Sequence, residues 1–158
     1  MNTLVAYYSL TGTTEQAVEE LTSYLNSKGH ATTVEKIIPK SEYSTLKAYT
    51  IGCMQALGKR TVELNAFQNI VEDFDMLVVI GPTWAWTCSP PVYSFVSNLS
   101  GAREKQKAIT ISTYQSSAGN GPKALAGVLA GKGFEIMGSL GINELGKMKE
   151  IFEKELRL

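Results

Sequence analysis

The fold of this chain is decided by the stretch Leu4-Val5-Ala6-Tyr7-Tyr8, followed directly by Ser9-Leu10-Thr11-Gly12-Thr13-Thr14. The first five residues form a short continuous apolar run, which is the pattern of a parallel strand covered on both faces. Apolar residues then recur at helical spacing from Ala17 to Leu25, and Lys28-Gly29 ends that helical pattern. The stretch therefore predicts a buried strand, a polar turn and an amphipathic helix.

The same alternation of strand and helix continues along the chain. Further strands are predicted at 31–38, 76–80, 107–113 and 134–140, and helices at 90–99, 122–131 and 145–156. Gly81-Pro82 is expected to end the third strand. Parallel strands joined by helices need right-handed crossovers, so we predict an α/β fold with five parallel strands and helices on both faces. Residues 1–158 are expected to form one domain.

The segment 41–71 has the least regular pattern. Its large apolar residues, Leu46, Tyr49, Ile51, Met54 and Leu57, are spaced as on a helix. A glycine at position 52 weakens that pattern, because glycine is a poor helix former. We expect a helix between the second and third strands.

The composition excludes several classes of protein. The 158 residues include 15 Lys+Arg and 15 Asp+Glu, so the formal net charge is zero. A nucleic-acid binder or a basic membrane-surface protein would normally carry an excess of cations. No apolar run approaches the ~20 residues of a membrane span. We therefore expect neither nucleic-acid binding nor membrane insertion.

The cysteine and histidine content points to a reducing compartment. Cys53, Cys88 and the single His30 are too few for a disulfide framework or a zinc site. This favours a cytoplasmic location, and no metal is expected. His30 follows Gly29 at a helix-to-strand turn, and we expect it at the surface. Cys88 is expected to be either an inert buried thiol or a redox thiol.

The charged residues are unevenly distributed. None occurs in 1–14, 76–102 or 108–122, and each of these segments runs through the loop beyond a predicted strand. In open α/β sheets, ligands bind at the carboxyl ends of the strands. The gaps fit a ligand held by backbone amides, hydroxyls and aromatic faces, and short turns without charge are the alternative interpretation.

The first of these loops has the features of a phosphate site. Residues 9–14 hold four hydroxyls and one glycine directly before a helix. Successive amides and the positive end of a helix can bind a dianion without lysine, and glycine permits the tight backbone path. The alternative is an ordinary Ser/Thr cap followed by a polar turn.

The second loop, 81–91, holds both tryptophans of the chain, Trp84 and Trp86. A loop tip is a poor place for a core tryptophan, so we expect these rings to stack on a planar ligand. The alternative is that they anchor the loop or a subunit contact. Tyr114, after the fourth strand, is a third candidate for stacking. Together the loops predict a site for a phosphorylated, planar, neutral-ringed ligand, which describes FMN.

At these residues the chain resembles the flavodoxin family. Residues 9–14 match the family's phosphate loop, Ser/Thr-x-Thr-Gly-x-Thr, and Pro82-Thr83-Trp84 is similar to the Pro-Thr-Trp of its second flavin loop. The resemblance covers essentially the whole chain. The chain lacks the insertion in the last strand that marks long-chain members of the family. The resemblance implies FMN as cofactor and a sheet of order 2-1-3-4-5.

The resemblance also implies which residues bind FMN. The phosphate would lie on Ser9, Leu10, Thr11, Gly12, Thr13 and Thr14, and the second flavin loop would comprise Pro82, Thr83, Trp84, Ala85 and Trp86. In that loop Trp84 would cover one flavin face. The other face and the pyrimidine edge would be approached by Thr113, Tyr114, Gln115 and Gly119. The chain departs from the family at Ala85-Trp86, where a glycine commonly lets a peptide flip toward flavin N5.

Three functions follow as expectations. The first is an electron carrier that shuttles electrons through non-covalently bound FMN between redox partner proteins, a reductase and an electron acceptor, with no catalytic acid or base. The second is an FMN-dependent NAD(P)H oxidoreductase acting on quinones, and the third is a flavin-free interaction module. Carriers resembling flavodoxin are usually acidic, whereas this chain is balanced. The carrier is preferred over an enzyme with its own substrate, as a monomer or weak homodimer.

Overall fold

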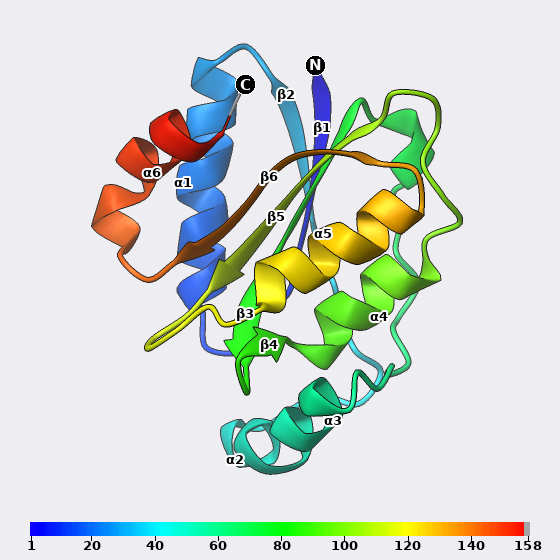
Figure 1. Cartoon of the computed structure of the whole chain (residues 1–158), viewed down its shortest axis with the longest axis vertical. Helices are drawn as coiled ribbons and strands as arrows, with labels where there is room; N and C mark the ends of the chain where they lie inside the picture. Colours follow the sequence, from blue (N-terminus) through cyan, green and yellow to red (C-terminus); the bar gives the residue numbers. More distant parts are fainter. Residues whose placement is uncertain (157–158) are drawn as a thin grey trace.

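The computed structural model describes residues 1–156 and contains one sheet with five long parallel strands (Figure 1). These strands are β1 (Asn2–Tyr7), β2 (Ala31–Lys36), β3 (Met76–Trp84), β5 (Lys107–Thr113) and β6 (Glu135–Ile142). They are arranged in the order β2-β1-β3-β5-β6. The short strand β4 (Thr87–Cys88) pairs antiparallel with the end of β3. With β4 set aside, the predicted α/β fold and the order 2-1-3-4-5 are confirmed.

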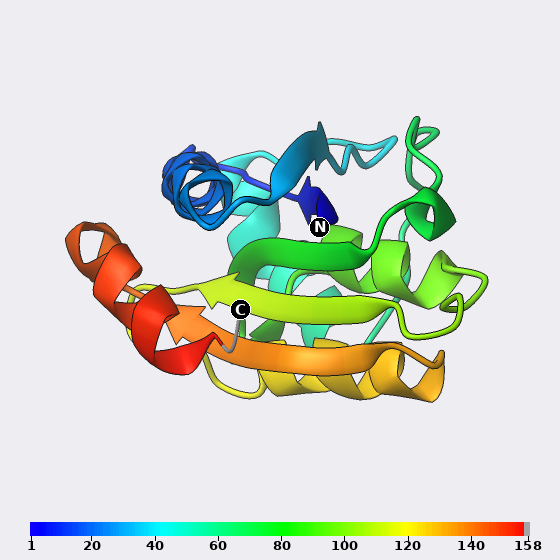
Figure 2. The same cartoon turned by 90° about the horizontal axis from the view of Figure 1, so that it is seen from above.

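Helices cover both faces of the sheet, as Figure 2 shows from above. One face packs on α1 (Thr13–Ser27) and α6 (Met148–Glu155), which follows a 3₁₀ turn at Leu145–Lys147. The other face packs on α4 (Pro90–Asn98) and α5 (Gly121–Gly131). Residues 76–80 of β3 are fully buried between these layers. No helix within residues 1–156 combines the length and apolar composition needed to cross a bilayer.

The third strand is longer than the sequence predicts. The expected stop at Gly81-Pro82 is wrong, because both residues continue the parallel pairing with β5. A Cβ at Gly81 would lie 2.4 Å from Cγ2 of Val92, so glycine is needed where α4 approaches the strand. Pro82 uses its carbonyl, which accepts a hydrogen bond from the amide of Ser89. The strand therefore reaches Trp84 and turns back into β4.

The helix predicted within 41–71 forms as three short connected pieces. These are α2 (Thr45–Lys47), a π-helical turn η1 (Ala48–Gly52) and α3 (Cys53–Leu57). Their buried positions are the small residues Ala48, Gly52 and Ala56. A separate 3₁₀ turn, η2 (Val71–Asp73), precedes β3. The large apolar residues that predicted this helix all lie on its exposed side.

His30 is buried, so its expected surface position is wrong. It lies just before β2 and is 8% exposed, and its Nδ1 is 3.3 Å from the hydroxyl of Thr3. Burial lowers the pKa of His30 below 6.5, and the positive N-terminus and Lys107 lower it further. The folded chain therefore favours the neutral imidazole.

This burial predicts a pH-dependent loss of stability that the variant His30→Gln reduces. Because the folded pKa lies below the unfolded value, the unfolded state binds more protons once the pH falls below about 6.5. The free energy of unfolding should drop between pH 7.5 and 5.5 in the wild type and drop less in the variant. Denaturant unfolding at the two pH values measures this, and equal drops would contradict it.

Candidate functional site

A cavity of about 550 Å³ opens at the carboxyl edge of the sheet. Its walls come from the three predicted loops and from the helical segment 45–57. The lining residues are Leu10, Thr11, Thr13, Thr14, Thr45, Ala48, Tyr49, Cys53, Leu57, Pro82, Thr83, Trp84, Ala85, Trp86, Thr113, Tyr114, Gln115, Ser116 and Ser117. The structure thus brings together three loops that are far apart in sequence.

The first loop leads directly into the N-terminus of α1. Gly12 occupies the N-cap position with φ of 91°, a left-handed conformation that glycine adopts without steric cost. Its amide donates to the hydroxyl of Ser9 at 3.1 Å. No side chain caps α1 within the described part of the chain. The amides of the first helical turn therefore remain available beside the lining residues Thr13 and Thr14.

Hydroxyl groups surround this helix end. The hydroxyls of Thr11 and Thr13 lie 3.4 Å apart and are exposed. The buried hydroxyls of Thr14 and Thr113 lie 2.8 Å apart and connect the first loop to the end of β5. Thr14 and Thr113 therefore fix the loop to the sheet, while Thr11 and Thr13 are accessible to a ligand.

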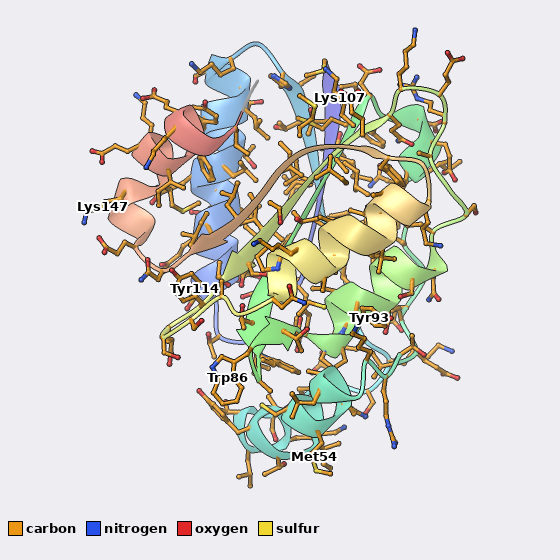
Figure 3. The ribbon with its side chains drawn as sticks, viewed as in Figure 1. Met54, Trp86, Tyr93, Lys107, Tyr114 and Lys147 are labelled. Carbon is orange, nitrogen blue, oxygen red and sulfur yellow. The ribbon has the colours of Figure 1, made fainter. Side chains whose placement is uncertain are left out.

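The second loop is a tight hairpin between β3 and β4. Trp84 pairs with Thr87, and the two residues between them have left-handed backbones, with φ of 48° at Ala85 and 61° at Trp86. Positive φ at both central positions is the type I′ geometry of two-residue hairpins, which normally use Asn, Asp or Gly there. Non-glycine residues are strained in this conformation. The hairpin places Trp86 at its tip, where it is 68% exposed (Figure 3).

The two tryptophans have different environments. Trp84 is only 9% exposed and belongs to the hydrophobic core. Its ring makes edge contacts with Tyr8 and Tyr43, with centroid distances of 5.9 and 5.0 Å. The expectation that this loop holds no core tryptophan is therefore wrong for Trp84, because the residue ends a strand and is covered by the 45–57 segment. It nevertheless lines the cavity, as does Trp86.

The third loop rests on the hairpin. The amide of Asn120 donates to the carbonyl of Trp86 at 2.8 Å, and the hydroxyl of Thr83 donates to the carbonyl of Ala118 at 3.4 Å. A Cβ at Gly119 would lie 2.0 Å from the Trp86 carbonyl oxygen, so only glycine permits this approach. The hairpin and the third loop therefore form one connected wall.

Most of the predicted site residues line the cavity. The exceptions are Ser9, Gly12 and Gly119, which shape the loops through the contacts just described. Tyr114 lines the cavity, and its ring also lies against Gly141, where a Cβ would come within 2.8 Å. Seven further lining residues were not predicted from the sequence: Thr45, Ala48, Tyr49, Cys53, Leu57, Ser116 and Ser117. The apolar spacing within 41–71 was the available signal for the helical wall, but it did not show which way that wall faces.

The site carries little charge. None of the lining residues is acidic. Glu15 follows the first loop, and its carboxylate lies 2.6 Å from the ammonium of Lys36, which lowers the Glu15 pKa. Burial raises the pKa of Cys88, so its thiol stays protonated. The cavity is therefore suited to a ligand whose own charge is met by amides and hydroxyls.

The sheet order and the cavity together define a protein with the flavodoxin-like fold. No protein family and no curated protein matches the sequence. Solved structures do match it.

A candidate flavoprotein from Bacteroides eggerthii has a TM-score of 0.73 at 18% identity, covering 97% of this chain and 96% of that one. A flavoprotein from Lactobacillus acidophilus in complex with FMN has a TM-score of 0.70 at 14% identity, covering 94% and 97%. An oxidised flavodoxin from Bacillus cereus has a TM-score of 0.61 at 12% identity, covering 98% and 96%. These likenesses establish the fold.

The strained turn predicts that Ala85→Gly stabilises the protein. Glycine removes the left-handed strain, which is worth about 1–2 kcal/mol, and the larger entropy of the unfolded glycine offsets about half of it. We expect a gain of about 1 kcal/mol in the free energy of unfolding, measured in denaturant. The control Ala66→Gly, where φ is not positive, should lose stability. A loss in Ala85→Gly as well would contradict the strain.

Proposed function

We propose that the chain binds FMN non-covalently in this cavity and carries electrons between redox partner proteins. The observation that carries the proposal is the uncapped N-terminus of α1, which borders an uncharged cavity with aromatic walls. One end of the cavity fits a phosphate and the rest fits a planar ring.

The end of the cavity beside α1 matches a phosphate group in the hydrogen-bond donors that it offers. Gly12 has a left-handed backbone at the start of α1. A Cβ built at this position would meet no atom within 4 Å, so the space beside the helix end is open. The first-turn amides and the exposed hydroxyls of Thr11 and Thr13 can donate hydrogen bonds to phosphate oxygens. The positive end of the helix dipole favours the dianion. These groups would hold the phosphate without a lysine or arginine.

The other end of the cavity matches a planar ring in its volume and in its aromatic walls. A volume of about 550 Å³ lies within the range usual for cofactor sites, about 300–1,000 Å³. Trp84, Trp86, Tyr49 and Tyr114 supply aromatic groups to its walls. Stacking of a planar ring on such groups contributes about 1–3 kcal/mol each. Gln115 and the backbone of the third loop can hydrogen-bond the polar edge of the ring.

The lining residues support a carrier rather than an enzyme with its own substrate. When bound, FMN supplies the electron-accepting and electron-donating chemistry. The only titratable side chains in the lining are the phenols of Tyr49 and Tyr114 and the thiol of Cys53. The walls therefore offer no carboxylate, imidazole or ammonium to move a proton on a substrate. Their lack of charge disfavours a negative charge on the ring.

The comparisons support this proposal through what the similar proteins bind. The Lactobacillus acidophilus flavoprotein is in complex with FMN, and the Bacillus cereus protein is a flavodoxin. In this proposal residues 1–158 act as one domain in the cytoplasm.

The phosphate end predicts that the double variant Thr11→Ala/Thr13→Ala loses affinity for FMN but not for riboflavin. Riboflavin shares the ring but has no phosphate. Hydrogen bonds to charged groups contribute about 1.5–3 kcal/mol each, so FMN binding should weaken about tenfold or more. Titration followed by flavin fluorescence measures both ligands, with Thr61→Ala as an exposed control. A chain that binds neither flavin, or an equal loss for both, would contradict the site.

The carrier role predicts that the FMN-loaded chain is not reduced by NADH or NADPH alone. Mixed anaerobically with either nucleotide, the chain should keep its oxidised visible spectrum, because a carrier of this kind has no binding site for the nucleotide beside the flavin. Addition of a separate flavin reductase should then bleach it. Rapid bleaching by the nucleotide alone would instead support the FMN-dependent oxidoreductase.

A further inference from the structure

The segment 45–60 presents an apolar surface to solvent beside the cavity. Its large side chains are half to three-quarters exposed, from 51% at Ile51 to 76% at Leu46. Figure 3 places Met54 of this segment and Trp86 of the hairpin at the same end of the molecule. We call this the cavity-rim surface, and its apolar members are Leu46, Tyr49, Ile51, Met54, Leu57 and Trp86.

The outward position of these side chains is built into the segment. Ala48, Gly52 and Ala56 are its buried residues, and a Cβ at Gly52 would lie 2.8 Å from the ring of Trp84. The hydroxyl of Tyr43 donates to the Gln55 side chain at 2.5 Å and fixes the segment further. The small residues thus attach the segment to the core and leave the large ones outside.

FMN bound in the cavity would cover only part of this surface. Tyr49, Leu57 and Trp86 line the cavity, but Leu46, Ile51 and Met54 do not. Several large apolar side chains exposed on one segment are typical of an interaction site in soluble proteins. Tyrosine, tryptophan, methionine and arginine are the residues enriched in the centres of protein interfaces.

The charges on the same segment indicate that the partner is negatively charged. Residues 43–62 contain Lys47, Lys59 and Arg60 and no acidic residue, although the whole chain is neutral. Lys59 and Arg60 are exposed and form no ion pair with a carboxylate in residues 1–156. Lys47 lies over the ring of Tyr43 at 5.2 Å. Two acidic residues flank the segment. Glu63 forms an ion pair with Lys40, and the negative charge of Glu42 contributes to the raised pKa of Lys36.

The charge pattern disfavours two other occupants. A second copy of this chain would bring the same cations face to face about a two-fold axis, with no acidic residue on the segment to pair with them. Anionic membranes are usually bound by clusters of about 4–8 Lys/Arg, more than this segment carries.

We propose that the cavity-rim surface docks a partner protein with an apolar centre and an acidic rim. The apolar side chains exclude water at the contact, and the three cations select the partner by charge and accelerate the encounter. That this partner exchanges electrons with bound FMN rests on the function proposed above. The docking itself does not.

Cytochrome c provides a matched pair of probes, because the native protein is basic and its succinylated form is acidic. The ¹⁵N-labelled full chain is titrated with each probe at low ionic strength, with and without FMN, and followed by NMR. We expect the succinylated probe to perturb amides in 45–60 and at the hairpin tip, and the native probe to leave them unchanged. Raising the salt should weaken the binding.

Two pairs of substitutions separate the charge from the apolar contact. Lys59→Gln/Arg60→Gln should weaken binding of the acidic probe about tenfold at low salt. Leu46→Ser/Met54→Ser should weaken it at high salt as well, because those residues act without charge. Neither pair lines the cavity, so flavin affinity should not change. Lys28→Gln/Lys149→Gln, outside the cavity-rim surface, is the control and should bind as the wild type does.

The outcomes separate this proposal from the proposed function. Perturbations that map elsewhere, or equal binding of both probes, would overturn the docking surface while leaving FMN binding intact. Shifts in 45–60 that depend on protein concentration alone would replace it with self-association, and binding only to phosphatidylserine vesicles would replace it with a membrane. A chain that binds no FMN but docks the acidic probe would retain the surface and reject the carrier.

Discussion

Parallel pairing of β1, β3 and β5, buried on both faces, is the constraint on which the rest of the structure depends. Because the strands run in one direction, their carboxyl ends meet at a single edge, and the loops that follow them meet there too. The 2.8 Å contact between the hydroxyls of Thr14 and Thr113 joins two of these loops across the sheet. The cavity is a consequence of this geometry.

The sequence predicts the sheet well because its signals are local. The apolar run before residues 9–14 and the glycine at the start of α1 are sufficient to identify a strand, a turn and a helix end. The hairpin is harder to predict, because Ala85-Trp86 lacks the glycine or asparagine that normally marks such a turn. Gly81-Pro82 resembles a strand end, whereas its glycine serves the approach of α4.

The burial of Trp84 and the helical wall of the cavity depend on contacts that no local pattern contains. The spacing of apolar residues between 45 and 57 predicts a helix correctly. It does not reveal that the small residues face the core, because helix patterns are normally interpreted with large residues inward. His30 illustrates the same limit, since it is buried beside Thr3 of the neighbouring strand β1, which is distant in sequence.

In most helices the large apolar residues face the core. In this segment the small residues Ala48, Gly52 and Ala56 do so, and the large ones lie outside. Folding constrains one side of the segment, and the outer side contributes little to the core. The outer residues that do not line the cavity, Leu46, Ile51 and Met54, can therefore change in size and charge without altering the sheet or the cavity. Substitutions at these few surface positions would change what the segment contacts while leaving the fold as it is.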